Sequence, residues 1–246
     1  MKKLWLLTTS FPFGKGEDTF INPELLQLAK RFDLKIFACE TVAGEINPSA
    51  KLPDGVRVIR IQTSKIKYVI NLIASAISPF VWRDVFTIHN SQFAIHNGPL
   101  AQPQNVGCDD SAHRDRYQNR RCAGVVAPCK LILSFAQAVK YAALARGITP
   151  WFKKEAAKNG APDIIYAFWH RPPLLAALRH KDRLGNPAIV CRAHGFDLYE
   201  HRQRSGYLPF HKWADNEIDG IYLVSQAGYD YYIEHFESSS KFKVQS

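Results

Sequence analysis

Cysteine is scarce in this sequence, with five residues among 246. They are odd in number and lie far apart, at positions 39, 108, 122, 129 and 191. Small secreted domains held together by disulfides carry a denser and usually even set of cysteines. The chain is therefore not a disulfide-stabilised scaffold, and we expect it in a reducing cytoplasm.

Several motifs that would announce a chemistry are also missing. Cys108, His113, Cys122 and Cys129 could be grouped into a zinc site, but no pair among them has C-x-x-C spacing, so we expect no metal. The sequence has no G-x-x-x-x-G-K-[ST] loop and no G-x-S-x-G elbow. Their absence removes the usual signatures of nucleoside triphosphatases and of α/β-hydrolases.

No apolar run is long enough to cross a membrane. The longest, residues 68–82, has about 15 residues and contains Pro79, whereas a spanning helix needs ~20. At the N-terminus, the apolar residues 4–7 are followed by Thr8-Thr9-Ser10 without a small-residue cleavage pattern. We therefore expect these residues to form a buried strand and not an export signal.

Concentrated charge is absent as well. The chain has 32 Lys and Arg against 22 Asp and Glu, a net charge of +10, but the excess is spread along the whole sequence. A nucleic-acid-binding protein concentrates basic residues in one run or on one face, so we expect no nucleic-acid partner. An evenly basic chain fits better with a small anionic ligand or the anionic face of a membrane.

What the sequence does contain is an alternation of apolar strands and amphipathic helices. A helix should open at Asn22-Pro23-Glu24, because Asn is a good N-cap and Pro suits the first turn. The alternation predicts an α/β fold, a single Rossmann-like domain with a mostly parallel sheet. Further strands are expected at residues 3–9, 34–39, 56–61, 164–168, 188–193, 221–224 and from 242 to 244, and further helices at 66–78, 131–146, 150–158, 174–181 and 226–236.

Residues 84–130 interrupt this alternation. They are dense in Asn, Gln, His, Arg and Cys and lack the apolar spacing of a packed element. A segment of this length without periodicity is uncommon inside a compact domain. We interpret it as a long irregular insertion or loop, or as sequence foreign to the original fold, such as a reading-frame slip.

The first candidate site is the loop of residues 14–19 (GKGEDT), between the first strand and the first helix. Gly14 and Gly16 begin like a dinucleotide-binding fingerprint, and Glu40 could mimic its ribose-binding acid. However, Thr19 stands where a third glycine is needed, and the Glu17 carboxylate would repel a phosphate at the helix N-terminus. A glycine-permitted turn whose acids complement the helix dipole is the simpler interpretation. A second possibility, which these residues leave undecided, is that the loop is mobile and closes over a polar acceptor.

The second candidate site is the stretch 192–199 (RAHGFDLY), directly after a strand. The carboxyl ends of parallel strands face the ligand crevice, which favours a functional role for His194. Gly195 allows a sharp turn, and the imidazole can bond a sugar hydroxyl or a phosphate oxygen. Asp197 could instead cap a helix with Glu200, and Arg192 could be a structural ion-pair partner.

Two further strand ends carry polar residues. His170 and Arg171 precede Pro172-Pro173 and could face the same crevice as His194, or they could lie in a solvated loop before a helix. Ser225 follows the strand at 221–224 and is a plausible helix N-cap first and a ligand hydroxyl second.

Taken together, these stretches resemble the N-terminal half of a family 4 glycosyltransferase of the kind that builds bacterial exopolysaccharide. The resemblance rests on Ser10-Phe11-Pro12, residues 16–21 (GEDTFI), residues 192–199 and Val224-Ser225. It covers residues 1–62 and 131–246, and the stretch at 192–199 is its most specific part. Residues 84–130 match nothing in that family.

The resemblance implies one half of a two-domain enzyme that transfers a hexose from a nucleotide-sugar with retention of configuration, without metal or other cofactor. In that family the N-terminal domain takes a glycan or lipid-linked acceptor. His194 would be the catalytic residue that contacts the transferred sugar, and the other candidate residues would bind substrate. The sequence ends where this domain should finish, so we expect the nucleotide-sugar-binding domain to be absent.

Two alternatives to the enzyme remain. A lone acceptor domain could be a non-catalytic module that binds a glycan or a protein partner. A nicotinamide-dependent oxidoreductase would rest on Gly14, Gly16 and Glu40 alone and ranks below both.

Residues 66–82 raise a separate question about the membrane. They are strongly apolar, Lys65 and Lys67 lie at their start, and Arg83 follows them. Such a segment can lie in the headgroup region of the inner face of the plasma membrane, where each basic residue adds about 1 kcal/mol. It can equally be a core helix packed against the sheet, because amphipathicity alone does not separate the two.

Overall fold

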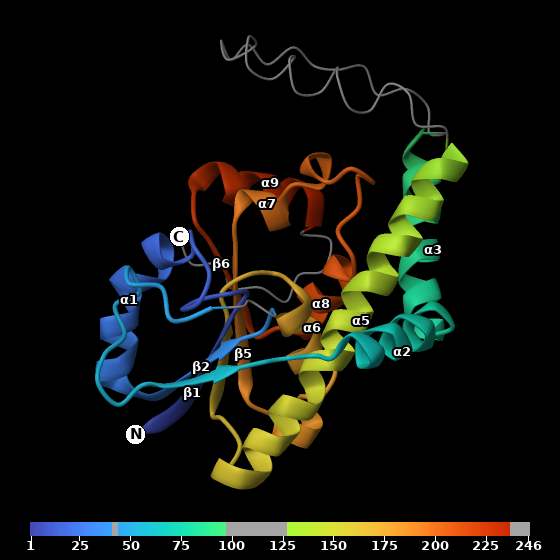
Figure 1. The fold of residues 1–246 in the computed structure, drawn as a ribbon. Helices are drawn as coiled ribbons and strands as arrows, with labels where there is room; N and C mark the ends of the chain where they lie inside the picture. The colour runs from blue at the N-terminus through green and yellow to red at the C-terminus, as the bar shows by residue number, and fades with distance from the viewer. Residues whose placement is uncertain (41–43, 97–126, 237–246) are drawn as a thin grey trace.

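The computed structural model describes residues 1–40, 44–96 and 127–236, and this part of the chain forms an α/β fold around one six-stranded parallel sheet (Figure 1). The strand order is β3-β2-β1-β4-β5-β6, the order of a Rossmann-like sheet, which confirms the predicted fold class. The strands are β1 (Lys2–Thr8), β2 (Phe32–Ala38), β3 (Arg57–Arg60), β4 (Ile164–Ala167), β5 (Ala188–Ala193) and β6 (Gly220–Leu223).

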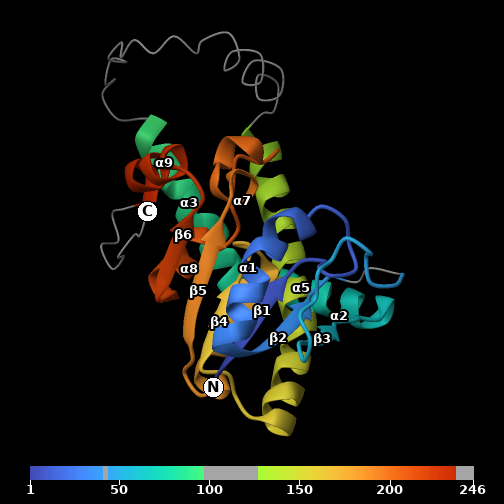
Figure 2. The same cartoon turned by 90° about the vertical axis from the view of Figure 1, so that its left-hand side faces the viewer.

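Helices cover the two faces of the sheet unequally. The helix α1 (Asp18–Arg31) lies on one face, and the remaining helices lie on the other face or above its edge (Figures 1 and 2). The latter are α2 (Lys65–Ala76), α3 (Pro79–His96), α5 (Ala127–Asn159), α6 (Pro172–Leu178), α7 (Gly195–Leu198), α8 (His211–Glu217) and α9 (Gln226–Phe236). Short 3-10 turns occur at η1 (Asp182–Leu184) and η2 (Glu200–Arg202).

The central strands are apolar along both faces because both faces are packed. In β1, alternate residues enter different cores: Trp5 and Leu7 face α5, whereas Leu4 and Leu6 face α1. On the α5 side, Trp5, Phe37 and Phe152 form an aromatic cluster with ring centroids 4.7 to 5.8 Å apart. This double burial gives the continuous apolar runs expected of parallel strands.

The first helix begins earlier than predicted. It starts at Asp18 instead of Asn22, so Pro23 lies inside it and removes one backbone hydrogen bond. The side chain of Asn22 does not cap this helix. Its amide N–H donates to the backbone oxygen of Ser49 at 2.8 Å, and its amide oxygen accepts the backbone N–H of Lys51 at 3.0 Å, both in the loop between β2 and β3.

The predicted break between residues 146 and 150 is also wrong, because α5 runs unbroken from Ala127 to Asn159. Gly147 serves close packing and not helix termination, since a Cβ there would lie 2.9 Å from the Thr63 hydroxyl. Pro150 is exposed, where the lost hydrogen bond costs least.

The prediction that residues 84–130 are irregular is wrong at both ends. Helix α3 continues to His96, and α5 already begins at Ala127. Val81 and Val85, one turn apart, are buried against the core and give α3 its packed side. The interior of this segment and the strand predicted at 242–244 lie outside the described residues.

Within the described residues, α5 is long and apolar enough to cross a membrane, and α2 with the first half of α3 reaches that composition as a pair bent by 58°. The finding for α5 differs from the expectation that no segment would qualify. Ala138, Ala142, Ile148 and Phe152 of α5 are buried in the core on the sheet, as in the core helix of a globular fold.

Candidate functional site

The loops after β1, β4 and β5 meet at the carboxyl edge of the sheet. Strand β1 pairs with β2 on one side and with β4 on the other. From β1 the chain builds β2 and β3 on one side, and it then crosses back to build β4, β5 and β6 on the other side. Such a switch point opens a crevice at the strand ends, which is where ligands bind in open α/β sheets. Glu17, Trp169 and His194 come together at this position.

The Glu17 carboxylate is fully occupied by this chain. One oxygen accepts hydrogen bonds from the backbone N–H groups of Ser10 and Phe11, both at 2.6 Å, and from the Ser10 hydroxyl at 2.9 Å. The other accepts from the Thr9 N–H at 3.1 Å and from the Trp169 indole at 2.6 Å. Burial alone would raise the pKa of Glu17, but these hydrogen bonds outweigh it and lower the pKa.

This arrangement argues against a dinucleotide site in the first loop. A pyrophosphate would need free backbone amides there, and Glu17 already takes those of residues 9–11. Gly14 is packed so closely that a Cβ would overlap the Ser10 side chain, and Gly16 has φ +98°, so both glycines serve the turn itself. Thr19 is exposed on α1.

The imidazole ring of His194 lies in an aromatic cage. Its ring centroid is 4.1 Å from that of Trp169, 5.3 Å from Phe168 and 6.0 Å from Phe20. The side chain is 9% exposed, and neither ring nitrogen bonds any residue of the described part of the chain. Burial lowers the pKa of His194, so at neutral pH the ring offers one N–H donor and one lone pair.

The backbone around His194 is held by Asp197. The Asp197 carboxylate accepts the N–H of His194 at 2.7 Å and the N–H of His170 at 2.6 Å, which joins the ends of β5 and β4. Asp197 does cap a helix, as the structural alternative predicted, but from within the first turn. It is the third residue of α7 and bonds the N-cap residue His194, and it does not form a capping box with Glu200. A Cβ at Gly195 would lie 2.7 Å from the Arg202 guanidinium, the end of a flexible side chain that can move, and 3.1 Å from the Tyr199 ring, so this turn packs closely against both.

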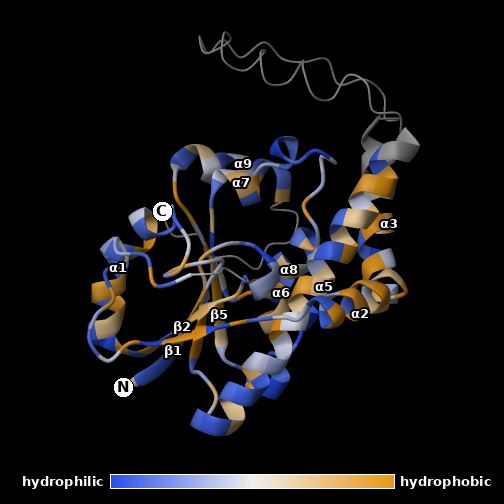
Figure 3. Ribbon diagram, in the orientation of Figure 1, coloured by the Kyte–Doolittle hydropathy of each residue, from blue (hydrophilic) through white to orange (hydrophobic). Residues whose placement is uncertain are grey.

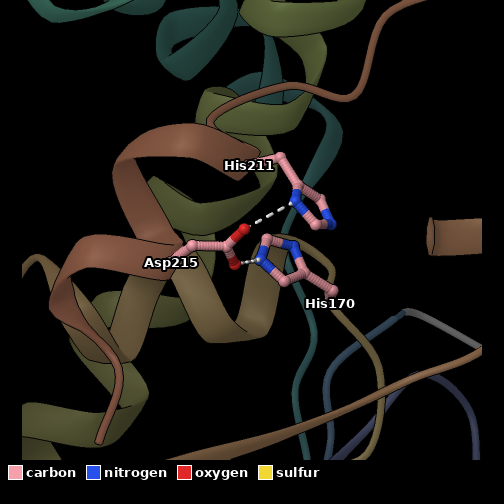
Figure 4. A group of neighbouring side chains, drawn as sticks. All are labelled: His170, His211 and Asp215. Atoms are coloured by element: carbon pink, nitrogen blue, oxygen red, sulfur yellow. Dashed lines mark hydrogen bonds and ion pairs between the residues drawn. The ribbon is translucent and has the colours of Figure 1, made fainter. Parts of the chain in front are cut away.

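The His170 side chain belongs to a buried cluster with His211 and Asp215 (Figure 4). The Asp215 carboxylate reaches the His170 ring at 3.2 Å through one oxygen and the His211 ring at 3.1 Å through the other. The two imidazoles stack with centroids 3.7 Å apart. His170 therefore does not sit in a solvated loop, although Pro172 does start the next helix as expected.

The hydrogen-bond partners assign the protonation states of this cluster. Both partners of the His211 ring, Asp215 and the backbone oxygen of Asp197 at 3.1 Å, are acceptors, so both ring nitrogens carry protons. Burial alone would lower the pKa of His211, but the Asp215 charge outweighs it and raises the pKa. Burial and the positive His211 lower the pKa of His170, which stays neutral.

The same geometry does not suit a metal ion, although the three side chains are of the right type. The two imidazole rings are stacked with planes only 18° apart, so the lone pairs of His170 and His211 lie in two nearly parallel planes that do not converge on one point between the rings. A cation in the plane of one ring would lie well outside the plane of the other. The cysteine and histidine group considered above falls outside the described side chains.

A cavity of about 200 Å³ opens beside Asp197 at the same edge of the sheet. Arg171, Glu40 and Phe196 form part of its wall. The Arg171 guanidinium lies 3.9 Å from the Glu40 carboxylate and 5.1 Å from the centroid of the Phe196 ring. Burial raises the pKa of Glu40 despite this arginine. The other lining residues are Gln137, Lys140, Tyr141, Leu144, His170, Pro172, Asp197, Gln203, Leu208 and Pro209.

Arg192 and Ser225 have structural roles in this part of the fold. The Arg192 guanidinium bonds Glu24 of α1 at 2.7 Å, as the ion-pair alternative anticipated. The Ser225 hydroxyl accepts the N–H of Gly228 at 3.1 Å and caps α9. Of the predicted site residues, the structure brings Glu17, His194, Gly195, Asp197 and the backbone of His170 together, with Arg171 in the adjoining cavity wall.

Sequence analysis missed several residues of this region. His211 and Asp215 are four residues apart on α8, a spacing that hydrogen-bonded pairs use in helices and that could have indicated them. Phe20 and Lys140 carried no signal, because they reach the site from α1 and α5 only after folding. Comparisons with models of known protein families and with curated proteins find no match to the chain.

Proposed function

We propose that this chain is the acceptor-side domain of a retaining glycosyltransferase, with His194 at its reaction centre. The observation that carries the proposal is the buried imidazole of His194, whose two nitrogens have no partner within the described residues. A buried polar group without a partner is costly, so its retention at a strand end favours a ligand that supplies the missing bonds.

The surroundings of His194 match a sugar. Trp169 and Phe20 present flat apolar surfaces of the type on which the C–H faces of a pyranose pack, and Phe20 is 51% exposed. A neutral imidazole can donate to one hydroxyl and accept from another. Orientation by a few polar groups within aromatic walls is the usual composition of a small-molecule site.

The cavity beside this cage adds a preference for charge. Arg171 and Lys140 line it together with two acids, Glu40 and Asp197. Glu40 lies 3.9 Å from Arg171, and the Asp197 carboxylate already accepts the backbone N–H groups of His170 and His194. Lys140 is exposed, and no ion pair of it is found among the described side chains. An acceptor that carries a phosphate or carboxylate would place it here, in keeping with the basic balance of the chain.

In the proposed reaction, this chain's residues bind and orient. His194 would hold a hydroxyl where the acceptor meets the transferred sugar, and the Glu17–Trp169 hydrogen bond would keep the cage wall in place. Preorganised contacts of this kind lower the barrier by fixing the geometry of attack. The nucleotide-sugar itself would be held by a second domain, as the sequence resemblance implies.

Calorimetry on the purified chain tests the proposal. Neutral and acidic oligosaccharides, UDP- and GDP-sugars and NAD are titrated into the wild type, into His194→Ala and into a control, His180→Ala, whose imidazole lies beyond α6 at the other end of the sheet. We expect an acidic oligosaccharide to bind, about tenfold or more weaker binding in His194→Ala, and no change in the control. Tight binding of NAD, or equal binding by all three proteins, would refute the proposal.

A further inference from the structure

The solvent-facing side of α2 is apolar along its whole length. Ile66, Val69, Ile70, Ile73 and Ile77 follow one another at helical spacing and are 53% to 75% exposed. In a globular helix this stripe would face the core. Here the core side of α2 is the opposite one, where Ser75 is buried and Leu72 and Ala76 pack against the main core.

The stripe continues onto α3 and α5. Trp82 is 41% exposed, Phe86 47% and Ile132 67%. The Trp82 indole donates to the backbone oxygen of Ala76 at 2.8 Å, and its ring stacks on Phe86, so α2 and α3 form one surface. We call Ile66, Val69, Ile70 and Ile73 of α2 and its C-cap residue Ile77, together with Trp82, Phe86 and Ile132, the apolar platform. Figure 3 shows hydrophobic colour along α2 and α3 on the side of the molecule away from α1.

The charge around the apolar platform has one sign. Residues 55–83 contain no Asp or Glu, whereas Lys65, Lys67 and Arg83 are exposed at its borders. The next acid, Asp84, is turned inward and accepts the N–H of Phe210 at 2.9 Å. In the part of the chain that the structure describes, the apolar surface is bordered by these cations, which complements the anionic headgroups above a hydrocarbon layer.

We propose that the apolar platform docks on an anionic lipid bilayer, with α2 lying in the plane of the headgroups. Helix α2 has 12 residues and a length of about 18 Å, short of the ~30 Å hydrocarbon core, so it does not cross a bilayer by itself. The pair of α2 and α3 is bent by 58°, and Val81 and Val85 of α3 are buried in the protein core, so we expect α2 to lie on the membrane. Trp82 takes the interfacial position that tryptophan favours. This inference is independent of glycosyl transfer and holds for any activity at the carboxyl edge.

The alternative occupant is a second copy of the chain. A two-fold pairing would set the border of this surface against the same border of the other copy, so Lys65, Lys67 and Arg83 would face cations or apolar side chains and no acid of residues 55–83. No acid on α2 could offset that repulsion. The lipid surface is therefore the occupant that the charges favour.

Vesicle flotation of the full chain tests the proposal. We compare vesicles of phosphatidylcholine alone with vesicles that also contain phosphatidylglycerol, for the wild type, for Ile70→Gln/Ile73→Gln and for Leu26→Gln. Leu26 is a matched control, because it is 49% exposed on α1, on the other side of the sheet. We expect the wild type and Leu26→Gln to float with the anionic vesicles, and about tenfold weaker partitioning for each isoleucine removed.

A charge variant separates the two parts of the interaction. Lys65→Gln/Lys67→Gln should reduce binding to anionic vesicles about fivefold per lysine, and added salt should reduce wild-type binding in the same way. All the substituted side chains are exposed, so circular dichroism should be unchanged. Wild type that stays soluble with anionic vesicles at low salt, or a solution dimer that Ile70→Gln/Ile73→Gln dissociates, would overturn the proposal.

Discussion

The Trp169 indole donates a 2.6 Å hydrogen bond to the Glu17 carboxylate, which ties the loop after β4 to the loop after β1. The same carboxylate gathers the backbone N–H groups of Ser10 and Phe11. One side chain therefore shapes the first loop and fixes a wall of the cage around His194. An acid that the sequence placed beside a glycine turn is the organising group of the crevice.

Replacing Glu17 should destabilise the fold and remove a pH dependence. In Glu17→Gln, an amide nitrogen faces N–H donors, and we expect a loss of about 3 kcal/mol in the free energy of unfolding. The pKa of Glu17 is lowered in the fold, so its contribution is complete above the unfolded value of 4.5 and is lost as pH falls through the folded value. Urea unfolding at several pH values measures both effects.

The exposed Glu217 of α8 provides the control for that measurement. Glu217→Gln should change the free energy of unfolding by less than about 0.5 kcal/mol at any pH. If both variants unfold alike, Glu17 does not organise the loop.

The buried cluster should depend on Asp215 in the same direct way. Asp215→Asn leaves the His211 imidazolium without its counter-charge, and we expect a loss of about 3 kcal/mol. In the wild type, the raised pKa of His211 means that this stabilisation is fully present below the unfolded value of 6.5 and is lost as pH rises through the higher folded value. Thermal unfolding across pH, with the exposed Asp182→Asn as control, tests this expectation.

Nitrogen-detected NMR can read the proposed protonation states. At pH 7 we expect both nitrogens of His211 to carry protons, and only Nε2 of His170, because that nitrogen donates to Asp215. Added zinc should leave these resonances in place, since the stacked rings do not converge on a cation. A zinc-dependent shift of both rings would contradict the hydrogen-bonded assignment.

Elements whose boundaries depend on local residues were the predictable part of the fold. The strand 188–193 and the helix 226–236 occur with the predicted bounds, because turn residues and a serine cap flank them. The predicted break in α5 was wrong because Gly147 is needed for close packing against Thr63, a residue distant in sequence. A glycine needed for close packing and one that ends a helix look the same in a sequence.

The site divides in the same manner. His194 was predictable from its position after a strand. The ion pair of Arg192 with Glu24 and the anchoring role of Asp197 for His170 depend on residues that folding brings together. The exposed stripe of α2 was visible as amphipathicity, but only the packed fold decides which side of the helix faces the solvent.

Arg192 should prove to be a modest structural contributor and not a ligand-binding residue. Its ion pair with Glu24 is partly exposed, and such pairs contribute about 1 kcal/mol or less. A double-mutant cycle with Arg192→Ala and Glu24→Ala should give a coupling energy in that range. Oligosaccharide affinity should be unchanged in Arg192→Ala, and a tenfold loss of affinity would return Arg192 to the site.

The sharpest prediction concerns His194→Phe. The substitution keeps an aromatic ring among Trp169, Phe168 and Phe20 but removes the two buried nitrogens that lack partners. Replacing unsatisfied polar atoms by apolar ones of similar shape is neutral or stabilising, and we expect a gain of about 1 kcal/mol in the free energy of unfolding. The same change should weaken oligosaccharide binding about tenfold or more, as in His194→Ala, since nothing then replaces the hydrogen bonds of the imidazole. A substitution that stabilises the fold but weakens ligand binding indicates that the native residue serves the ligand and not stability. Urea unfolding and calorimetry on one preparation measure both quantities, and a destabilised variant that still binds would show that His194 serves the core alone.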